Sequence, residues 1–364
     1  MINKEKMNQS YIFENLFILE LANNHWGSLK RAKQIVREFA HIVKQNKVKA
    51  AIKLQFRDVD SFIHKDFRNE GTGIDLICLP KRSRYIQKTS KTKLSCDEMR
   101  ELVEYIKKHD CIPMATPFDE KSVEMCTDMS FPIIKVASSD INDWLLLNKI
   151  ASTQIPVILS TGGANDKQID DVVEFFYNRN ISIALNHCVS KYPSEDSELE
   201  LNQIDYLKHK YPNIVIGLST HEYRDWRSSM LISYAKGVRI WERHIDIPYP
   251  QGHEQKEVSN YCSLPHQIDE WFKAHSKAVE MCGTSVMSRR IIDQKESSYL
   301  EALYRGLYLK RNIKRGEKIT ISDIYSAIPY QKELNQISSR DFIENDAIAI
   351  RDLIKDSPLT KNDI

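Results

Sequence analysis

The sequence predicts an α/β protein, a (β/α)8 TIM barrel followed by a small β-rich domain. Eight short, apolar, β-branched runs alternate with amphipathic stretches of helical length over about 250 residues. A near-continuous apolar run is typical of a parallel strand that is buried on both faces. The character of the sequence changes after about residue 285, where a short repeat begins. A doubly wound open sheet is the alternative for the first part, but eight even units favour a closed barrel.

The expected strands are bounded by polar, glycine or proline residues, and the expected helices lie between them. Ser95 and Glu98 have the S-x-x-E spacing of a capping box, which marks a helix start. The polar stretch 57–94 reads as an insertion at the C-terminal face of the barrel, where barrel enzymes carry their active sites. The strands are expected over 16–21, 48–55, 111–116, 132–138, 156–161, 181–190, 214–220 and 238–245, and helices over 28–45, 97–109, 143–153, 166–179, 200–210 and 226–237.

The C-terminal part contains a short internal duplication. RNIKRGEKITISDI (311–324) and RDLIKDSPLTKNDI (351–364) share Arg, Thr, Asp and Ile at matching positions. This predicts a small pseudo-symmetric domain, near the lower size limit for folding alone. We expect a barrel domain over 1–285, a linker over 286–305 and the small domain over 306–364.

Composition excludes several classes of protein. The 52 basic and 50 acidic residues nearly cancel, which disfavours nucleic-acid or anionic-lipid binding. No apolar run approaches the roughly 18 residues of a membrane helix, and the N-terminus lacks the apolar core of a signal peptide. Seven cysteines without a C-x-x-C pair argue against a disulfide framework. We therefore expect a cytoplasmic protein.

Nearly every expected strand ends in polar side chains, where ordinary packing would place apolar residues or turn formers. These ends meet at one face of a barrel, so the concentration indicates an enzyme. The candidates are Glu20, Asn23, Asn24, His25, Lys53, Gln55, Thr116, Lys135, Ser138, Ser139, Asp140, Ser160, Thr161, His187, Ser190, Tyr192, His221, Glu242 and His244.

Lys53 and Lys135 lie inside apolar strand segments, where an ammonium group is costly unless it is paired. One interpretation is a structural ion pair with Glu20 or Glu242. The other is a functional role, in binding an anion or in forming a Schiff base. Hydroxyl side chains at neighbouring strand ends and the Gly162–Gly163 pair would add donors suited to a phosphate or carboxylate.

His221 and His244 end the seventh and eighth expected strands. Neighbouring strands lie about 4.8 Å apart, so two imidazoles at similar height could share one metal ion. Two neutral nitrogens favour Mn²⁺, Fe²⁺, Co²⁺ or Zn²⁺ over Mg²⁺, with water and substrate in the open positions. A single buried histidine is more often a core residue, so the metal prediction depends on the pair.

Eight strings follow one another along the chain, namely ELANNHWGSL (20–29), AIKLQ (51–55), ATPFDEKSVE (115–124), IKVASSD (134–140), PVILSTGG (156–163), LNHCVSKYPSE (185–195), GLSTHE (217–222) and ERHI (242–245). Together they resemble the sialic acid synthase family, which includes the N-acetylneuraminate, legionaminic acid and pseudaminic acid synthases. The tail, with KRGEKITISDI (314–324) as its opening, resembles that family's antifreeze-like (SAF) domain. The resemblance implies condensation of phosphoenolpyruvate with an open-chain acylamino sugar, which gives a nonulosonic 2-keto acid and phosphate.

The resemblance also implies roles for individual residues. A divalent metal, Mn²⁺ first and Mg²⁺ or Co²⁺ as alternatives, would bind His221 and His244. Asp140 would activate the water that attacks C2, and the other catalytic residues would be Glu20, Lys53 and Lys135. The sugar would contact Glu20, Gln55 and Gln255. Phosphoenolpyruvate would contact Lys53, Thr116, Lys135, Ser138, Ser160, Ser190 and Tyr192. The family also implies a homodimer in which each tail domain covers the partner's barrel.

Three departures from the family pattern fall on the sugar side. Thr220 stands where the family has an aspartate in the seventh-strand motif. The segment IPYPQGHEQKEVS (247–259) replaces the usual loop and places Gln255 near the position of a sugar-binding aspartate. Ile328 stands where a tail arginine reaches the partner's sugar pocket. We therefore expect an acceptor other than N-acetylmannosamine, or a partly degenerate site.

Three other functions stay open at this point. A related barrel synthase could act on another aldehyde or a phosphosugar, although the basic run that would bind its phosphate is as well explained by a solvated surface. A Schiff-base aldolase would use Lys135. A non-catalytic homologue would bind phosphoenolpyruvate without turnover. The basic run comprises Lys81, Arg82, Arg84, Lys88, Lys91 and Lys93.

Overall fold

The computed structural model describes residues 11–65, 80–253, 255, 257–283 and 288–364, without the side chains of residues 80–84. Contacts within the chain divide it into two compact units, Met1–Gly283 and Thr284–Ile364. Among the described residues, no helix has the length and apolar character that a membrane span requires.

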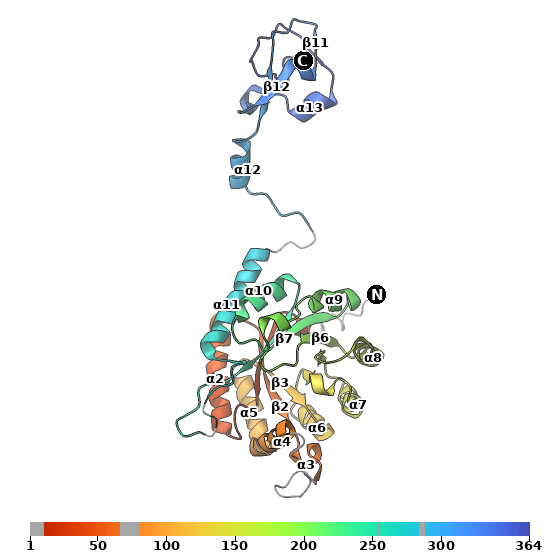
Figure 1. The fold of residues 1–364 in the computed structure, drawn as a ribbon, viewed down its shortest axis with the longest axis vertical. Helices are drawn as coiled ribbons and strands as arrows, with labels where there is room; N and C mark the ends of the chain where they lie inside the picture. Colours follow the sequence, from red (N-terminus) through yellow and green to blue (C-terminus); the bar gives the residue numbers. More distant parts are fainter. Residues whose placement is uncertain (1–10, 66–79, 254, 256, 284–287) are drawn as a thin grey trace. The chain divides into compact units, whose positions relative to one another are not determined.

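The first unit is a closed barrel of eight parallel strands (Figure 1). Each strand pairs with the next along the chain, and β1 also pairs with β8, which closes the sheet. This confirms the predicted barrel and rules out the open sheet. The strands are β1 (Leu16–Ala22), β2 (Ala50–Phe56), β3 (Ile112–Pro117), β4 (Ile134–Val136), β5 (Val157–Ser160), β6 (Ile183–Cys188), β7 (Val215–Thr220) and β8 (Ile240–Ile245), and a short β9 (Cys262–Ser263) pairs with the end of β8.

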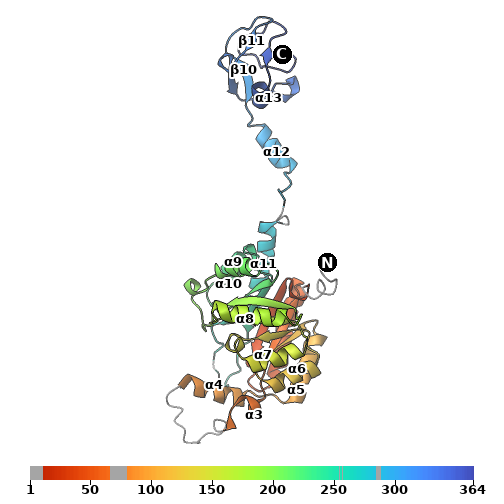
Figure 2. The same cartoon turned by 90° about the vertical axis from the view of Figure 1, so that its right-hand side faces the viewer.

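Helices surround these strands, with α3 and α4 next to each other at one end of the unit (Figures 1 and 2). α5 begins at the predicted capping box, where Ser95 Oγ accepts a hydrogen bond from the Glu98 amide and the Glu98 carboxylate accepts one from the Ser95 amide. The helices are α2 (Leu29–Asn46), α3 (Val59–Phe62), α4 (Pro80–Lys91), α5 (Cys96–Lys108), α6 (Glu120–Asp128), α7 (Trp144–Ser152), α8 (Asp166–Tyr177), α9 (Gln203–Lys210), α10 (Trp226–Ala235) and α11 (Pro265–Cys282).

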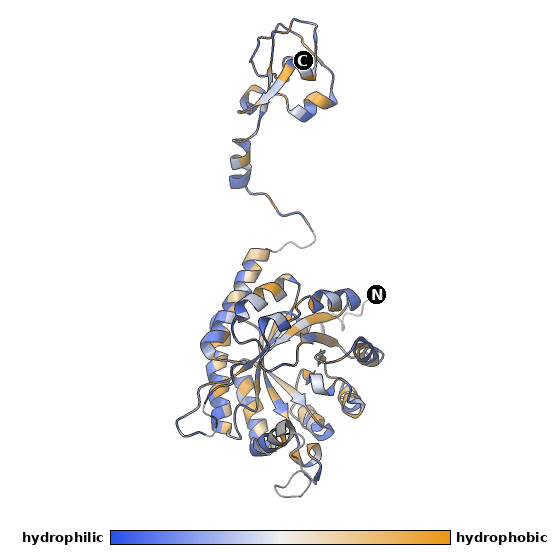
Figure 3. Cartoon of the chain, viewed as in Figure 1, coloured by the Kyte–Doolittle hydropathy of each residue, from blue (hydrophilic) through white to orange (hydrophobic). Residues whose placement is uncertain are grey.

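The barrel has two apolar layers. One lies between the strands and the helices, which carry both orange and blue residues in Figure 3, because each helix buries only one side. The other fills the inside of the barrel at the N-terminal ends of the strands. It consists of Phe13, Leu16, Ile18, Ala51, Met114, Ile133, Ile158, Ala184 and Ile240.

The interior changes from apolar to polar within one strand repeat. Because side chains alternate between the two faces of a strand, the residue two positions further on points the same way. Ile18 is followed on this face by Glu20, and Ala51 by Lys53. The same step leads from Met114 to Thr116, from Ile133 to Lys135, from Ile158 to Ser160, from Ala184 to Asn186 and from Ile240 to Glu242. The C-terminal half of the barrel interior is therefore a polar site on an apolar floor.

The second unit has its own apolar core and two antiparallel strand pairs. Both copies of the internal repeat make the same contacts. Arg311 Nε donates to Asp323 and Arg351 Nε to Asp363, each over 2.8 Å. The backbone of Ile313 in the first copy pairs with that of Leu353 in the second. The elements are α12 (Gln294–Glu301), β10 (Gly306–Leu309), β11 (Lys318–Ile319), β12 (Ile324–Ala327), α13 (Ser339–Glu344) and β13 (Ala347–Ile348).

Candidate active site

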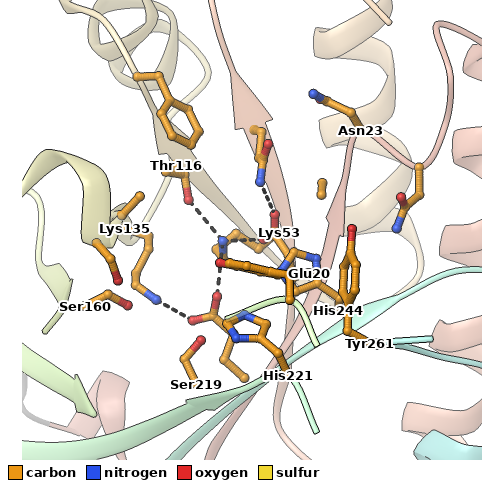
Figure 4. Close-up of a pocket in the computed structure, with 18 of the residues that line it drawn as sticks. Glu20, Asn23, Lys53, Thr116, Lys135, Ser160, Ser219, His221, His244 and Tyr261 are labelled. Carbon is orange, nitrogen blue, oxygen red and sulfur yellow. Dashed lines mark hydrogen bonds and ion pairs between the residues drawn. The ribbon is translucent and has the colours of Figure 1, made fainter. Parts of the chain in front are cut away.

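A cavity of about 400 Å³ opens at the C-terminal ends of the barrel strands. Most of the side chains predicted from the strand ends line it, and Figure 4 shows ten of the lining residues labelled. The cavity is lined by Glu20, Ala22, Asn23, Asn24, Lys53, Gln55, Arg57, Tyr85, Lys88, Thr89, Thr116, Phe118, Lys135, Ala137, Ser138, Ser160, Cys188, Tyr192, Ser219, His221, Glu242, His244 and Tyr261.

A buried charge network forms the floor of the cavity. Lys53 Nζ pairs with Glu20, lies 3.3 Å from Glu242 Oε1 and donates to Thr116 Oγ1 over 3.0 Å. Lys135 Nζ pairs with Glu242 Oε2 at 2.5 Å (Figure 4). Both lysines are almost fully buried, so each ammonium group depends on these carboxylates. The ion pairs predicted under the structural interpretation are present, and they lie inside a cavity large enough for a ligand.

Electrostatics keep Glu242 and Lys53 ionised, whereas burial raises the pKa of Glu20. Burial alone would raise the pKa of Glu242, but the charges of Lys135 and Lys53 lower it to about 2. Burial would lower the pKa of Lys53, but Glu20 and Glu242 outweigh that effect and raise the pKa above its ordinary value. Asn186 adds a hydrogen bond of 3.2 Å to Glu242 Oε2. Glu242 is therefore a shared counter-ion for both lysines.

The imidazoles of His221 and His244 are neighbours, with ring centroids 5.4 Å apart and the ring planes tilted by 47°. Burial and the neighbouring His244 lower the pKa of His221 to about 3, and burial and Lys53 lower the pKa of His244 to about 3. Both rings are therefore neutral near pH 7 and have a lone pair to offer. His221 Nδ1 lies 3.2 Å from the Val189 carbonyl oxygen, which leaves Nε2 for a ligand.

The pair suits a divalent transition-metal ion in its donor chemistry. Within the described residues, no group of three or more His, Cys, Asp or Glu is arranged to hold a metal ion. An ion at the imidazole pair would therefore need water and substrate to complete its coordination. The ring of Tyr192 lies over His221, with centroids 3.9 Å apart, and screens this side of the cavity.

Hydroxyl groups gather around Gly162, in the loop after β5. A Cβ atom on Gly162 would overlap Ser190 Oγ and would lie 2.6 Å from Ser138 Oγ. The Cys188 thiol hydrogen-bonds with both hydroxyls. Glycine at this position therefore leaves room for two hydroxyl donors, as a bound anion would require. Ser190 does not line the cavity itself but lies beside Ser138, which does.

Asp140 does not line the cavity, although Ser138, two residues before it, does. Its Oδ1 accepts a hydrogen bond of 2.8 Å from Ser139, and its buried Oδ2 has no hydrogen-bond partner among the described residues. Burial raises the pKa of Asp140 to about 6, although the positive charge of Arg57 opposes this. A carboxyl group with this pKa can take up a proton near neutral pH.

Models of two families match the chain. The NeuB family model matches residues 42–286, and the SAF domain model matches residues 304–364. The chain belongs to the NeuB family. This confirms the resemblance to the sialic acid synthases, the expectation of a SAF domain and the expectation of an enzyme of this type.

Similar proteins cover nearly the whole NeuB-family chain. A pseudaminic acid synthase of Campylobacter jejuni is 27% identical over 346 residues, which are 91% of this chain and 94% of that protein. An uncharacterised protein of Methanocaldococcus jannaschii is 29% identical over 327 residues, 89% of this chain and 88% of the other. Among solved structures, a Chromobacterium violaceum protein described as spore coat polysaccharide biosynthesis protein E has a TM-score of 0.84 at 30% identity, covering 96% of this chain and 99% of that one.

Some predicted site residues of this NeuB-family chain lie outside the cavity. Gln255 donates to the Glu257 carbonyl oxygen over 2.7 Å and does not line the cavity. Thr220 lies behind the wall, where its hydroxyl is 3.4 Å from Arg243. Ile328 is exposed on the second unit. The cavity also lacks His25, Ser139, Thr161 and His187, while the side chains of Lys81, Arg82 and Arg84 lie outside the described residues.

Arg57 is the main lining residue that the sequence analysis did not select. Its guanidinium group lies 3.6 Å from the centre of the Phe118 ring, and NH1 donates to Gln55 Oε1 over 2.8 Å. Gln55 in turn donates to Glu20 Oε1 over 2.8 Å. Two features of the sequence pointed to Arg57. It lies two positions beyond Gln55, on the same face of the strand, and the aromatic residue Phe118, on which a guanidinium group can stack, follows the neighbouring strand.

Proposed function

We propose that this protein condenses phosphoenolpyruvate with an open-chain acylamino sugar, giving a nonulosonic 2-keto acid and phosphate. One observation carries the proposal. Although the whole chain is nearly neutral, the cavity is lined by four cationic side chains, Lys53, Arg57, Lys88 and Lys135, and by two carboxylates. A neutral imidazole pair lies beside them. Such a cavity suits a multiply charged anion next to a polarised carbonyl group.

The phosphoenolpyruvate end would lie between the two lysines and Gly162. Lys53 and Lys135 would offset the charges of the substrate's carboxylate and phosphate groups. Thr116, Ser138, Ser160 and Ser190 would donate hydrogen bonds to them. Because these groups are fixed on strand ends, they would hold the reacting carbon in place before the acceptor arrives. Tyr192 would cover one side of this half of the site.

His221 and His244 would hold a divalent ion, Mn²⁺ in the first instance. When bound, such an ion would supply Lewis-acid polarisation of the acceptor's aldehyde. Glu20, with Gln55 on its other oxygen, would orient the hydroxyl groups of the acceptor from the neighbouring strand ends.

In the first half of the reaction, C3 of phosphoenolpyruvate would form a bond to the aldehyde carbon, the aldehyde oxygen would take up a proton, and C2 would be left cationic. Asp140 would act in the second half, where it would take a proton from the water that adds to C2. The C2–O bond to phosphate would then break while the new C2 hydroxyl passes its proton to the departing phosphate, which leaves the 2-keto group and releases inorganic phosphate. The raised pKa of Asp140 suits this role, because a base near neutral pKa can both accept and return a proton.

The acceptor would differ from N-acetylmannosamine. This is supported by the place of Gln255 outside the cavity and by Ile328 in the tail. Arg57 lies at the end of the Gln55–Glu20 hydrogen-bond chain, and its buried Nε has no hydrogen-bond partner among the described residues. A guanidinium group in this position would recognise an oxygen-rich group of the acceptor.

A Schiff-base aldolase is the weaker candidate. A lysine that attacks a carbonyl must lose its proton, and burial without a counter-charge is the usual way to achieve this. Here Glu20 and Glu242 raise the pKa of Lys53, and Glu242 holds the ammonium group of Lys135 at 2.5 Å. Both contacts stabilise the protonated amine and oppose imine formation.

Two further features belong to the proposal. In solution the protein would be a homodimer, with the SAF domain of each subunit over the partner's barrel. It would act in the cytoplasm, which is supported by the free thiols of the six described cysteines.

The test is phosphate release from phosphoenolpyruvate with Mn²⁺ and a panel of acylamino hexoses and their 6-phosphates. We expect release with at least one sugar, and loss of release in Lys135→Met. Phosphoenolpyruvate binding without release on any sugar would support the non-catalytic homologue instead. Borohydride trapping of pyruvate on Lys135 would support the aldolase.

A further inference from the structure

The side chains that alternate with the cavity-lining residues of β7 and β8 form a buried cluster behind the cavity. Successive residues of a strand point to opposite faces. His221 and His244 line the cavity, so the residues next to them point away from it. They meet at Arg243, which is 1% exposed, and Glu222, which is fully buried. We call this set the Arg243 cluster; it consists of Thr220, Glu222, Arg243 and Ser263.

Arg243 uses every part of its guanidinium group in this cluster. NH1 pairs with Glu222 Oε1 at 2.7 Å, and NH2 donates to the Glu222 backbone carbonyl over 2.8 Å. NH1 also lies 3.4 Å from Thr220 Oγ1, and Nε donates to Ser263 Oγ over 3.0 Å. One side chain thus holds both the carboxylate and the backbone of residue 222.

The β7–β8 ladder ends before His221, and on the other side the Ser194 amide donates to the His221 carbonyl oxygen over 3.1 Å. β7 ends at Thr220, and the last pairing between β7 and β8 joins Thr220 to Arg243. His221 is the next residue, beyond the ladder. The contact from Arg243 to the Glu222 carbonyl continues the connection between the two strands past this point. Arg243 directly precedes His244, so a single guanidinium group links the neighbours of both imidazoles.

We propose that the Arg243–Glu222 ion pair is a positioning device that sets the spacing of His221 and His244 and so determines the affinity of the site for a divalent cation. The inference rests on the metal-binding role in the proposed function. Neither side chain lines the cavity, so the pair sets the backbone positions of the two imidazoles without contacting the ion itself.

The Arg243 cluster also accounts for the departure at Thr220. The resemblance leads to an aspartate at position 220, but this chain places a carboxylate two residues later. Residues 220 and 222 lie on the same face of the chain, and both contact Arg243. The charge that balances Arg243 is therefore present at Glu222, and Thr220 is not a sign of a degenerate site.

The test is Mn²⁺ binding, measured by electron paramagnetic resonance and by titration calorimetry without substrates. Arg243→Lys keeps the positive charge but loses the branched guanidinium group that makes several contacts at once. Glu222→Gln keeps the size and shape of the side chain but loses its negative charge. We expect each to weaken Mn²⁺ binding about 10–100-fold, as removal of a group behind a metal ligand does. Phosphoenolpyruvate affinity should stay near that of the wild type, because the lysines are untouched.

Arg31→Lys is the matched control. Arg31 forms an ion pair of the same length, 2.7 Å, with Asp246 and is also buried, but it contacts no residue next to His221. We expect it to lower thermal stability and to keep wild-type Mn²⁺ affinity. An equal loss of Mn²⁺ affinity in this variant would show general loosening of the barrel and would overturn the positioning role.

Other outcomes separate this inference from the proposed function. If Mn²⁺ binds to the wild type and is lost in His221→Ala, but binds normally to Arg243→Lys and Glu222→Gln, the positioning role is wrong and the metal site stands. If the wild type binds no Mn²⁺ through the imidazole pair, both fail. If the two cluster variants do not fold, Glu222→Asp decides, because it keeps the negative charge but shortens the reach to Arg243. Unchanged Mn²⁺ affinity in that variant would overturn the inference.

Discussion

At the scale of single residues, a step of two positions along a strand leads from an apolar side chain of the barrel core to a polar side chain of the cavity. Ile240, Glu242 and His244 follow one another on the inner face of β8, and Ala51, Lys53 and Gln55 do so on β2. This alternation is visible in the sequence, which is why both lysines and both histidines could be predicted. Arg57 was not selected, because its position two residues beyond Gln55 points to the cavity only when it is combined with Phe118, which follows another strand.

The pH dependence of the reaction tests the role of Asp140. Burial raises its pKa from 3.8 to about 6. A base must be ionised to act, so kcat/KM should fall as the pH drops through about 6. Asp140→Asn should lower kcat about 10²–10⁴-fold and remove this limb, while any limb from the phosphate group of the substrate remains. Initial rates of phosphate release between about pH 5 and 8 measure the fall in kcat/KM and the loss in kcat. This range brackets the expected pKa of Asp140.

Asp143→Asn is the control for that experiment. Asp143 lies three residues further on and caps α7 through the Leu146 amide, a role that asparagine also fills. It should keep most of the rate and keep the acid limb, displaced to lower pH because the charge of Asp143 helps to raise the pKa of Asp140. A variant at position 140 with the wild-type profile would show that another group activates the water.

At the scale of elements, hydrophobic pattern and hydrogen-bond ladder do not coincide. The apolar run 132–138 predicts a longer strand than β4, which spans only Ile134–Val136 before the chain turns into the 3-10 helix Ser138–Asp140. Ile133 is buried without belonging to the ladder. α6 was not predicted, because its nine residues bury only Ser122, Val123 and Cys126 and leave a weak apolar stripe. The hydrophobic pattern of the sequence indicates which residues are buried, whereas backbone pairing with a neighbouring strand determines where the strand begins and ends.

The loop between β5 and α8 offers a test of the phosphoenolpyruvate end. Gly162→Ala should displace the hydroxyls of Ser138 and Ser190 and weaken phosphoenolpyruvate binding about 10-fold or more, as the loss of one or two hydrogen bonds to a charged group would do. Titration calorimetry measures the affinity, and thermal unfolding shows whether the barrel is intact. In Ser138→Ala the added methyl group has more room, so Gly162→Ala should cost less there. Wild-type affinity in Gly162→Ala would place the phosphate elsewhere.

At the scale of the whole molecule, the two units have separate cores. The repeat in the second unit could be read from sequence because both copies keep the Arg–Asp contact that closes each loop. The proposed role of this unit in catalysis could not, since that role would depend on a second copy of the chain. The acceptor is likewise not encoded in any one string, because side chains from many strand ends and loops define the cavity.

Removal of residues 306–364 tests the contribution of the second unit. The barrel core lies within the first unit, so the shortened protein should fold and bind phosphoenolpyruvate with near wild-type affinity. Its KM for the acceptor should rise, because the proposed partner contact is lost. Steady-state kinetics and calorimetry distinguish the two substrates. Equal losses for both would contradict a role limited to the acceptor.

The carboxylate of Glu242 is a counter-ion that the barrel itself supplies to its buried lysines. It lies between the ammonium groups of Lys53 and Lys135, which are also the groups that a bound anion would contact. The two buried positive charges are therefore paired within the protein itself. The stability of the barrel therefore does not depend on a bound substrate, and the chain can fold before any substrate binds. The corresponding cost is competition, because a substrate anion bound as proposed would share both lysines with Glu242.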